Sequence, residues 1–102
     1  MNGIPVGIAG IGKGLPDWVV PNDYFQQFFE TSDEWIRQRA GIKERRWLRE
    51  GERPSDLFVA AGRDTLEMAG VTPAEIDLVV VASVSGDYTV PSLACVVKTA
   101  WA

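Results

Sequence analysis

The stretch TSDEWIRQRAGI (residues 31–42) predicts a short helix whose two ends are both encoded in the sequence. Thr31 and Glu34 have the T-x-x-E spacing of a capping box, in which each side chain satisfies a free backbone N–H at the helix start. Acidic side chains on the first turn and basic side chains on the last turn complement the helix dipole. Gly41 stands where a left-handed residue ends a helix.

Trp35 and Arg39 are four residues apart, so they share one face of this predicted helix. An indole beside a guanidinium offers a planar surface and a cation to a ligand that stacks and carries phosphate. The alternative is that Trp35 is a half-buried anchor and Arg39 its solvated partner. The stretch alone favours this structural alternative, because short motifs often match by chance.

The composition is that of an ordinary soluble globular chain. Its 102 residues hold one domain at most, with 46% hydrophobic and 24% charged residues. A net charge of −4 argues against a nucleic-acid or membrane-surface protein. The longest apolar run, Leu78–Ala82, is too short to cross a membrane, and no secretory signal is visible. We therefore expect a cytoplasmic protein.

The sequence contains one cysteine and no histidine. A single cysteine excludes an internal disulfide and a multi-cysteine metal site, which fits a reducing compartment. The missing histidine excludes any imidazole base within this chain and removes the commonest metal ligand. The last residues, Val96–Ala102, end without a cap or a polar tail, so we expect the domain to be incomplete at its C-terminal end.

The first residues predict a tightly packed strand. Apolar side chains alternate with small ones over Ile4–Ile11, and Gly10 and Gly12 then allow close backbone approach. The Gly10-Ile11-Gly12 run resembles part of a dinucleotide-binding fingerprint. However, its third glycine is missing and Pro16 stands where the helix of that motif would begin. We expect a strand that leaves through a glycine turn.

The next segment predicts a short helix and then an extended arm. Asn22 is expected as the N-cap, and three phenylalanines at helical spacing are expected in the core: Phe25, Phe28 and Phe29. Residues 42–48 predict an extended arm or hairpin. Its Arg45-Arg46-Trp47 run would suit a nucleic-acid patch, but in an acidic chain we expect a solvated strand.

The second half predicts a βαβ-like layout. Ser55 is expected to cap a helix over 56–69 that ends at Gly70, and residues 72–75 repeat the capping-box spacing over one short turn. The continuous apolar run at 78–84 suits a strand covered on both faces, as in a parallel sheet. Strand, crossover helix and buried strand define an α/β fold.

A further helical segment is expected to start at Pro91 and to carry Cys95, after a turn at residues 86–88. The neighbours of the cysteine are apolar (Leu93, Ala94, Val96 and Val97), so we expect a small buried thiol with a structural role. The functional alternative is an exposed thiol that is activated at a helix start.

In this order, these signals resemble the start of a β-ketoacyl-acyl-carrier-protein synthase III. The resemblance rests on the glycine-rich first strand with Pro16 and Asn22, the 31–42 block, Arg45-Arg46, and the runs SDL (55–57), EMAG (67–70), IDLVVVAS (76–83) and PSLAC (91–95). It covers essentially all 102 residues but only the opening third or so of a family member. The 31–42 block is specific for the type III branch, whereas the βαβ pattern fits any thiolase-like enzyme.

The resemblance implies a partial thiolase-like α/β fold. Residues 1–102 would form the N-terminal part of its first half, arranged as strand, helices and strand around an incomplete sheet. We expect the unpaired apolar edge at 78–84 to make such a fragment self-associate.

The activity implied by the resemblance is a decarboxylating Claisen condensation that joins an acyl-CoA to malonyl-acyl-carrier-protein and begins fatty-acid synthesis. Acyl-CoA and acyl carrier protein are the implied partners, the full-length enzyme is expected to be a homodimer, and the coenzyme A thioester is a substrate, with no separate cofactor or metal. The family's catalytic Cys, His and Asn are expected beyond residue 102. We therefore predict no catalytic residue in this chain and no activity for the fragment alone.

The resemblance implies a coenzyme A mouth in this chain. Trp35 would stack on the adenine, Arg39 would flank it, and Thr31 would line the same mouth, which reverses the preference for a structural Trp35. Ala40 departs from the family, where threonine is usual before the glycine. Val90 falls where members often place a larger residue near the acyl pocket and dimer contact, so primer preference stays open.

Two alternatives remain at this point. One is part of a related condensing enzyme that makes a polyketide or another secondary product, and the other is a stand-alone module that binds coenzyme A or a protein without chemistry. A reading frame that continues to a Cys, a His and an Asn would favour an enzyme, and a stop codon after Ala102 would favour the module.

Overall fold

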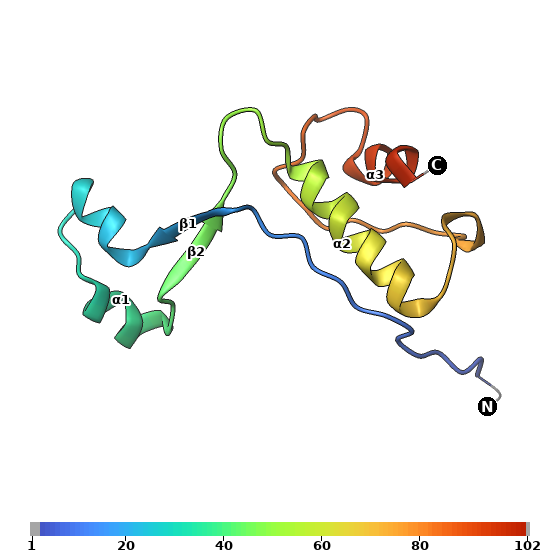
Figure 1. Ribbon diagram of the computed structural model, residues 1–102, viewed down its shortest axis with the longest axis horizontal. Coiled ribbons are helices and arrows are strands. Elements are labelled where there is room, and N and C mark those ends of the chain that lie inside the picture. The colour runs from blue at the N-terminus through green and yellow to red at the C-terminus, as the bar shows by residue number, and fades with distance from the viewer. Residues whose placement is uncertain (1–2, 102) are drawn as a thin grey trace. The chain divides into compact units, whose positions relative to one another are not determined.

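The computed structural model describes residues 3–101, which divide into two compact units (Figure 1). The first, the hairpin unit, comprises Leu15–Glu52. The second, the helical unit, comprises residues 3–14 together with 53–101. Each unit has its own secondary structure and its own contacts, and each is described by itself.

The hairpin unit contains a two-stranded antiparallel sheet. Strand β1 (Trp18–Pro21) pairs with β2 (Glu44–Trp47), so that Trp18 lies opposite Trp47 and Pro21 opposite Glu44. Between the strands lie the 3₁₀ helix η1 (Asn22–Gln27) and the α-helix α1 (Asp33–Ala40). The extended arm predicted for residues 42–48 is confirmed, whereas β1 was not predicted.

Asn22 is the buried polar centre of the hairpin unit, at 1% exposure. Its side-chain amide donates to Asp33 Oδ1 (2.8 Å) and to the Ile42 carbonyl (2.7 Å), and its oxygen accepts from the Arg45 guanidinium (2.8 Å). The prediction that Asn22 caps a helix is therefore wrong. The side chain makes no capping bond because partners that are remote in sequence use its donor and its acceptor.

Aromatic rings gather around β1, β2 and η1. Tyr24 makes edge-to-face contacts with Trp18, Phe25, Phe28 and Trp47 at centroid distances between 5.5 and 5.9 Å. Phe28 and Phe29 were expected in the core, but they are 65% and 56% exposed. The 3₁₀ helix ends at Gln27, so these two rings lie beyond it and do not continue a helical stripe.

The helical unit is built on α2 (Pro54–Ala69), with the one-turn 3₁₀ helix η2 (Pro73–Glu75) and α3 (Leu93–Trp101). Helix α2 starts after Arg53, whose backbone N–H donates to Asp56 (3.1 Å), and it ends at Gly70 with φ of 67°. The C-terminal boundary is as predicted. The N-cap is not Ser55, which lies in the first turn.

Two carboxylates fix the loops of the helical unit. Glu75 accepts from the backbone N–H of Thr72 (2.8 Å) and from its hydroxyl (2.9 Å), which lowers the pKa of Glu75 and confirms the predicted capping box. Asp87 accepts from the Ser55 hydroxyl (2.5 Å) and from the Ser55 backbone N–H (2.9 Å). The hydroxyl contact is the main cause that lowers the pKa of Asp87. It ties the loop before α3 to the start of α2.

Three glycines let the N-terminal segment lie directly on α2 (Figure 1). A Cβ atom at Gly10 would lie 2.5 Å from the Thr65 carbonyl oxygen, and one at Gly12 would lie 2.7 Å from the Thr65 nitrogen. At Gly14 the added atom would collide with the backbone of Leu57. Only glycine fits these alternate positions, so residues 10–14 pack tightly on α2, whereas the tightly packed strand predicted over Ile4–Ile11 does not form.

Neither of the two strands predicted in the helical unit forms a ladder within residues 3–101. Their side chains are also open to solvent, with Val6 at 93% and Val80 at 81% exposure. A β-strand needs a neighbour for its N–H and C=O groups, and no described segment supplies one to residues 4–11 or 78–84. Residues 3–14 and 53–101 therefore form no sheet.

Helix α3 packs on α2 through Leu93 and Val97, which are one turn apart and buried. Trp101 adds a hydrogen bond from its indole N–H to the Val59 carbonyl (3.4 Å). Cys95 lies two positions from both buried residues, on the other side of the helix, and is exposed. The prediction of a buried thiol is therefore wrong. No helix in residues 3–101 has the length and apolar character needed to span a membrane.

The glycine contact leads to a stability test. We predict that Gly12→Ala destabilises the chain by about 1–3 kcal/mol, the usual cost of overpacking, because the added methyl meets backbone atoms that cannot move aside. Urea denaturation followed by circular dichroism measures the effect. Gly7→Ala is the matched control, since nothing lies within 4 Å of its added Cβ. Equal unfolding midpoints for the two variants would contradict the packing described here.

Candidate functional site

Helix α1 carries the candidate site, and its two ends are fixed by local contacts. The Ser32 hydroxyl accepts from the Trp35 backbone N–H (3.1 Å), and Gly41, with φ of 70°, donates to the Arg37 carbonyl (2.8 Å). The end at Gly41 is as predicted. The predicted cap pair is wrong, because the helix starts one residue later and Glu34 instead accepts from Gln38 (3.2 Å).

The first residue of α1 connects the helix to the rest of the hairpin unit. Asp33 accepts from the Asn22 amide through one carboxylate oxygen and from Arg37 Nε, at 2.8 Å, through the other. Asn22 also holds Ile42, two residues beyond the helix. One buried amide therefore fixes both ends of the segment that bears Trp35.

Trp35 and Arg39 lie together on the outer face of α1. The guanidinium carbon of Arg39 is 5.4 Å from the centroid of the Trp35 ring, and Trp35 is 55% exposed. The predicted shared face is confirmed, and the half-buried anchor is not what the structure contains. The cation lies over one face of the indole, and more than half of the Trp35 surface remains exposed.

A cleft of about 470 Å³ opens beside Trp35. It is lined by Phe29, Glu30, Thr31, Ser32 and Trp35, which come from the segment after η1 and from the start of α1. The Thr31 hydroxyl oxygen is buried without a hydrogen-bond partner among the described residues. Leaving such a group unsatisfied costs free energy.

The structure thus brings Thr31 and Trp35 to one cleft, with Arg39 stacked on the tryptophan. Val90 belongs to the helical unit, where it is 84% exposed in the loop before α3. Sequence reasoning missed Phe29 and Glu30 as lining residues. The available signal was their position directly before Thr31.

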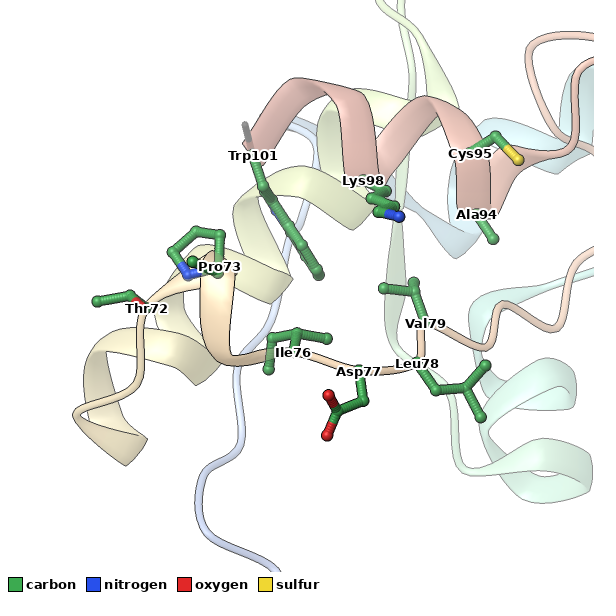
Figure 2. Close-up of a pocket in the computed structure, with 11 residues that line it drawn as sticks. Thr72, Pro73, Ile76, Asp77, Leu78, Val79, Ala94, Cys95, Lys98 and Trp101 are labelled. Atoms are coloured by element: carbon green, nitrogen blue, oxygen red, sulfur yellow. The ribbon is translucent and has the colours of Figure 1, made fainter.

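A larger, mainly apolar pocket of about 670 Å³ lies in the helical unit (Figure 2). Figure 2 shows Trp101, Lys98 and Ala94 on α3 facing residues 76–79, with Pro73 of η2 at the end. This hollow borders the unpaired 78–84 segment.

Sequence and structure comparisons agree on one family. No protein-family model matches the chain. It is 48% identical over 93 residues to a β-ketoacyl-acyl-carrier-protein synthase III of Staphylococcus haemolyticus, and 49% identical over 92 residues to that of Clostridium beijerinckii. These matches cover 91% and 90% of this chain but 30% and 28% of the relatives.

Solved structures give the same result. The 3-oxoacyl-acyl-carrier-protein synthase III of Aquifex aeolicus matches with a TM-score of 0.86 and 37% identity, over 92% of this chain and 30% of that one. The priming β-ketosynthase of the R1128 polyketide pathway matches with a TM-score of 0.85 and 34% identity, over 98% of this chain and 32% of that one.

The fold is therefore a partial thiolase-like α/β fold of the condensing enzymes. Within that class, the chain is a segment of the β-ketoacyl-acyl-carrier-protein synthase III family, and it spans about 30% of the length of the curated relatives it matches.

Proposed function

We propose that the chain is the N-terminal, coenzyme A-binding portion of a 3-oxoacyl-acyl-carrier-protein synthase III. The complete enzyme would condense acyl-CoA with malonyl-acyl-carrier-protein, with decarboxylation, to initiate fatty-acid synthesis. The observation that carries the proposal is the exposed Trp35, with the Arg39 guanidinium over its ring, beside a cleft that Thr31 also lines.

Each residue of the proposed mouth has a distinct task. The free face of Trp35 stacks on the adenine, while Arg39 covers the other face and offers its N–H groups to phosphate. Thr31 supplies the hydroxyl that otherwise lacks a partner. The three positions come from one short segment, residues 31–39, so folding of the hairpin unit is sufficient to form them.

The condensation chemistry needs groups that this chain lacks. A cysteine thiolate must take the acyl group from coenzyme A, and donors must stabilise the charge that develops on the malonyl thioester. The chain has no histidine, and its cysteine, Cys95, has the Ser92 hydroxyl as neighbour, with an oxygen-to-sulfur distance of 3.2 Å. We infer that Cys95 is not the nucleophile and that the chain alone is inactive.

The wider proposal follows the family. It includes acyl carrier protein as a partner, a homodimer for the complete enzyme, a cytoplasmic location and no cofactor apart from the thioester substrate. Val90, which is exposed before α3, is proposed to lie near the acyl pocket and the dimer contact. Residues 1–102 would together form one incomplete domain of that enzyme.

A second candidate is the start of a condensing enzyme of polyketide synthesis. It is favoured by the similarity to a priming β-ketosynthase, which covers 98% of this chain at 34% identity. Both candidates keep the same mouth. The acyl group that the complete enzyme accepts as primer would distinguish them.

We predict self-association of the chain. Large apolar side chains are exposed along both segments that were expected to be strands: Ile4, Val6, Ile8, Leu78, Val80 and Val84. Unpaired apolar segments of this kind favour pairing with another chain. Sedimentation velocity should show species larger than a monomer that increase with concentration, and a compact monomer at every concentration would refute the proposal.

We predict that Trp35→Ala weakens binding of coenzyme A to the 102-residue chain about tenfold. Stacking on an aromatic side chain contributes about 1–3 kcal/mol per base, and about 1.4 kcal/mol corresponds to tenfold in affinity. Isothermal titration calorimetry measures the dissociation constant. Phe28→Ala is the control, since Phe28 is also exposed (65%, against 55% for Trp35) but does not line the cleft. Unchanged affinity in a folded Trp35→Ala chain would exclude the stacking role.

We predict that acetyl-CoA does not acylate the chain. Acyl transfer needs an activated thiolate, and residues 3–101 offer Cys95 no histidine base. Intact-mass analysis after incubation should show the unmodified chain. A stable acetyl adduct that disappears in Cys95→Ser would show that Cys95 is reactive and would overturn this prediction.

A further inference from the structure

The loop before α3 is attached to the rest of the helical unit mainly through one side chain. None of residues 84–92 is buried, so apolar burial does not hold the loop. Within the described part of the chain, its hydrogen bonds to remote residues both come from Ser55, and Asp87 accepts both. The other hydrogen bonds found for this loop join residues at most four positions apart.

The partner of Asp87 is the first donor of α2. Pro54 opens the helix and has no N–H, so the Ser55 N–H is the first backbone donor that needs an acceptor. Ser55 is also buried, at 3% exposure, and a buried hydroxyl needs a partner of its own. The two groups donate to different oxygens of the same carboxylate. A negative charge at this position complements the helix dipole, so the contact is suited to a carboxylate.

The loop also lies against the first residue of α3. A Cβ atom added at Gly86 would be 3.5 Å from the Leu93 Cβ, and Leu93 is buried. Val90 stands three residues after Asp87 and three residues before Leu93. The position of Val90 therefore follows from the contacts on both sides of it, and loss of the Asp87 contact leaves it fixed only toward α3.

We propose that Asp87 is a positioning residue, which holds the loop of residues 84–92 on the start of α2 through Ser55 and thereby places Val90. The inference deepens the proposed function and rests on it for one point, the location of Val90 near the acyl pocket. The acyl group that the complete enzyme accepts would then depend on a carboxylate that touches no substrate.

The contact depends on pH in a definite direction. The Ser55 hydroxyl is the main cause that lowers the pKa of Asp87; burial opposes it, and the Ser55 N–H and the charge of Arg53 lower the pKa further. The contact therefore contributes stability above the ordinary aspartate pKa of about 3.9, and this stability is lost as the pH falls through the lower pKa of the folded chain. Other titratable groups on the segments around this contact are Asp56 in the first turn of α2, Tyr88 in the loop, and Cys95 and Lys98 in α3.

The test follows the Ser55 and Val90 amides by ¹H–¹⁵N NMR in dilute solutions of the 102-residue chain. In the unmodified chain, the Ser55 amide shift should titrate with a midpoint below about 3.9, and the ¹H–¹⁵N nuclear Overhauser effect of Val90 should fall at the same midpoint. Asp87→Asn should abolish this titration and lower the Val90 effect at neutral pH. It should also speed hydrogen exchange of the Ser55 N–H about tenfold, in the range of one hydrogen bond to a charged group.

Two further variants sharpen the test. Ser55→Ala removes the hydroxyl but keeps the N–H, so it should move the midpoint toward the ordinary aspartate value. Asp64→Asn is the matched control, since it removes a carboxylate from α2 without touching the contact. A Val90 effect that is the same in Asp87→Asn and in the unmodified chain would overturn the positioning role, and so would an equal response to Asp64→Asn. Loss of the Trp101 indole N–H signal at the Ser55 midpoint would also overturn it, because it would show general unfolding in acid.

A binding measurement separates this inference from the proposed function. Trp35 and Arg39 lie in the hairpin unit, so Asp87→Asn should bind coenzyme A as the unmodified chain does. If coenzyme A binds to neither chain, the proposed mouth fails, whereas the NMR measurements still decide the role of Asp87.

Discussion

The three hydrogen bonds of the Asn22 side chain hold together the segments that form the candidate site. The amide is buried, and it joins the start of α1 at Asp33, the residue after the helix turn at Ile42, and β2 at Arg45. Helix α1 has no fully buried residue of its own, so hydrophobic burial contributes little to holding it in place. A polar network that is fully satisfied does so instead, and it leaves the outer face of α1 free for Trp35.

A comparable constraint acts in the helical unit, through geometry instead of hydrogen bonding. Gly10, Gly12 and Gly14 contact successive turns of α2. Two residues of extended chain advance by about 6.6 Å, and four residues of α-helix advance by about 6.0 Å. The two repeats nearly match, so a glycine at every second position meets the helix backbone once per turn. The motif that resembles a dinucleotide fingerprint is thus explained by packing.

Local features of the sequence were sufficient to predict the helix ends and part of the candidate site. Gly41, Gly70 and the Thr72–Glu75 box act within a few residues, so their spacing predicts their conformation. The roles of Asn22 and β1 depend on partners up to about thirty residues away, which spacing cannot reveal. The strand expected at 78–84 failed for the same reason, because a strand is defined by its neighbour. Glu30 was missed because its position directly before Thr31 does not by itself distinguish a residue that lines a cleft from a solvated one.

All residues of the candidate site lie in one of the two units, and this location bears on the activity of the chain by itself. Thr31, Trp35 and Arg39 all lie within Leu15–Glu52, and that unit contains no cysteine. In coenzyme A the adenine and the thioester are at opposite ends of a long molecule, so a site for the base need not include a nucleophile. Binding energy from a remote part of a substrate is used to position the reacting part. Under the proposed function, the residues that recognise the nucleotide would therefore all lie within Leu15–Glu52, a unit that contains no cysteine.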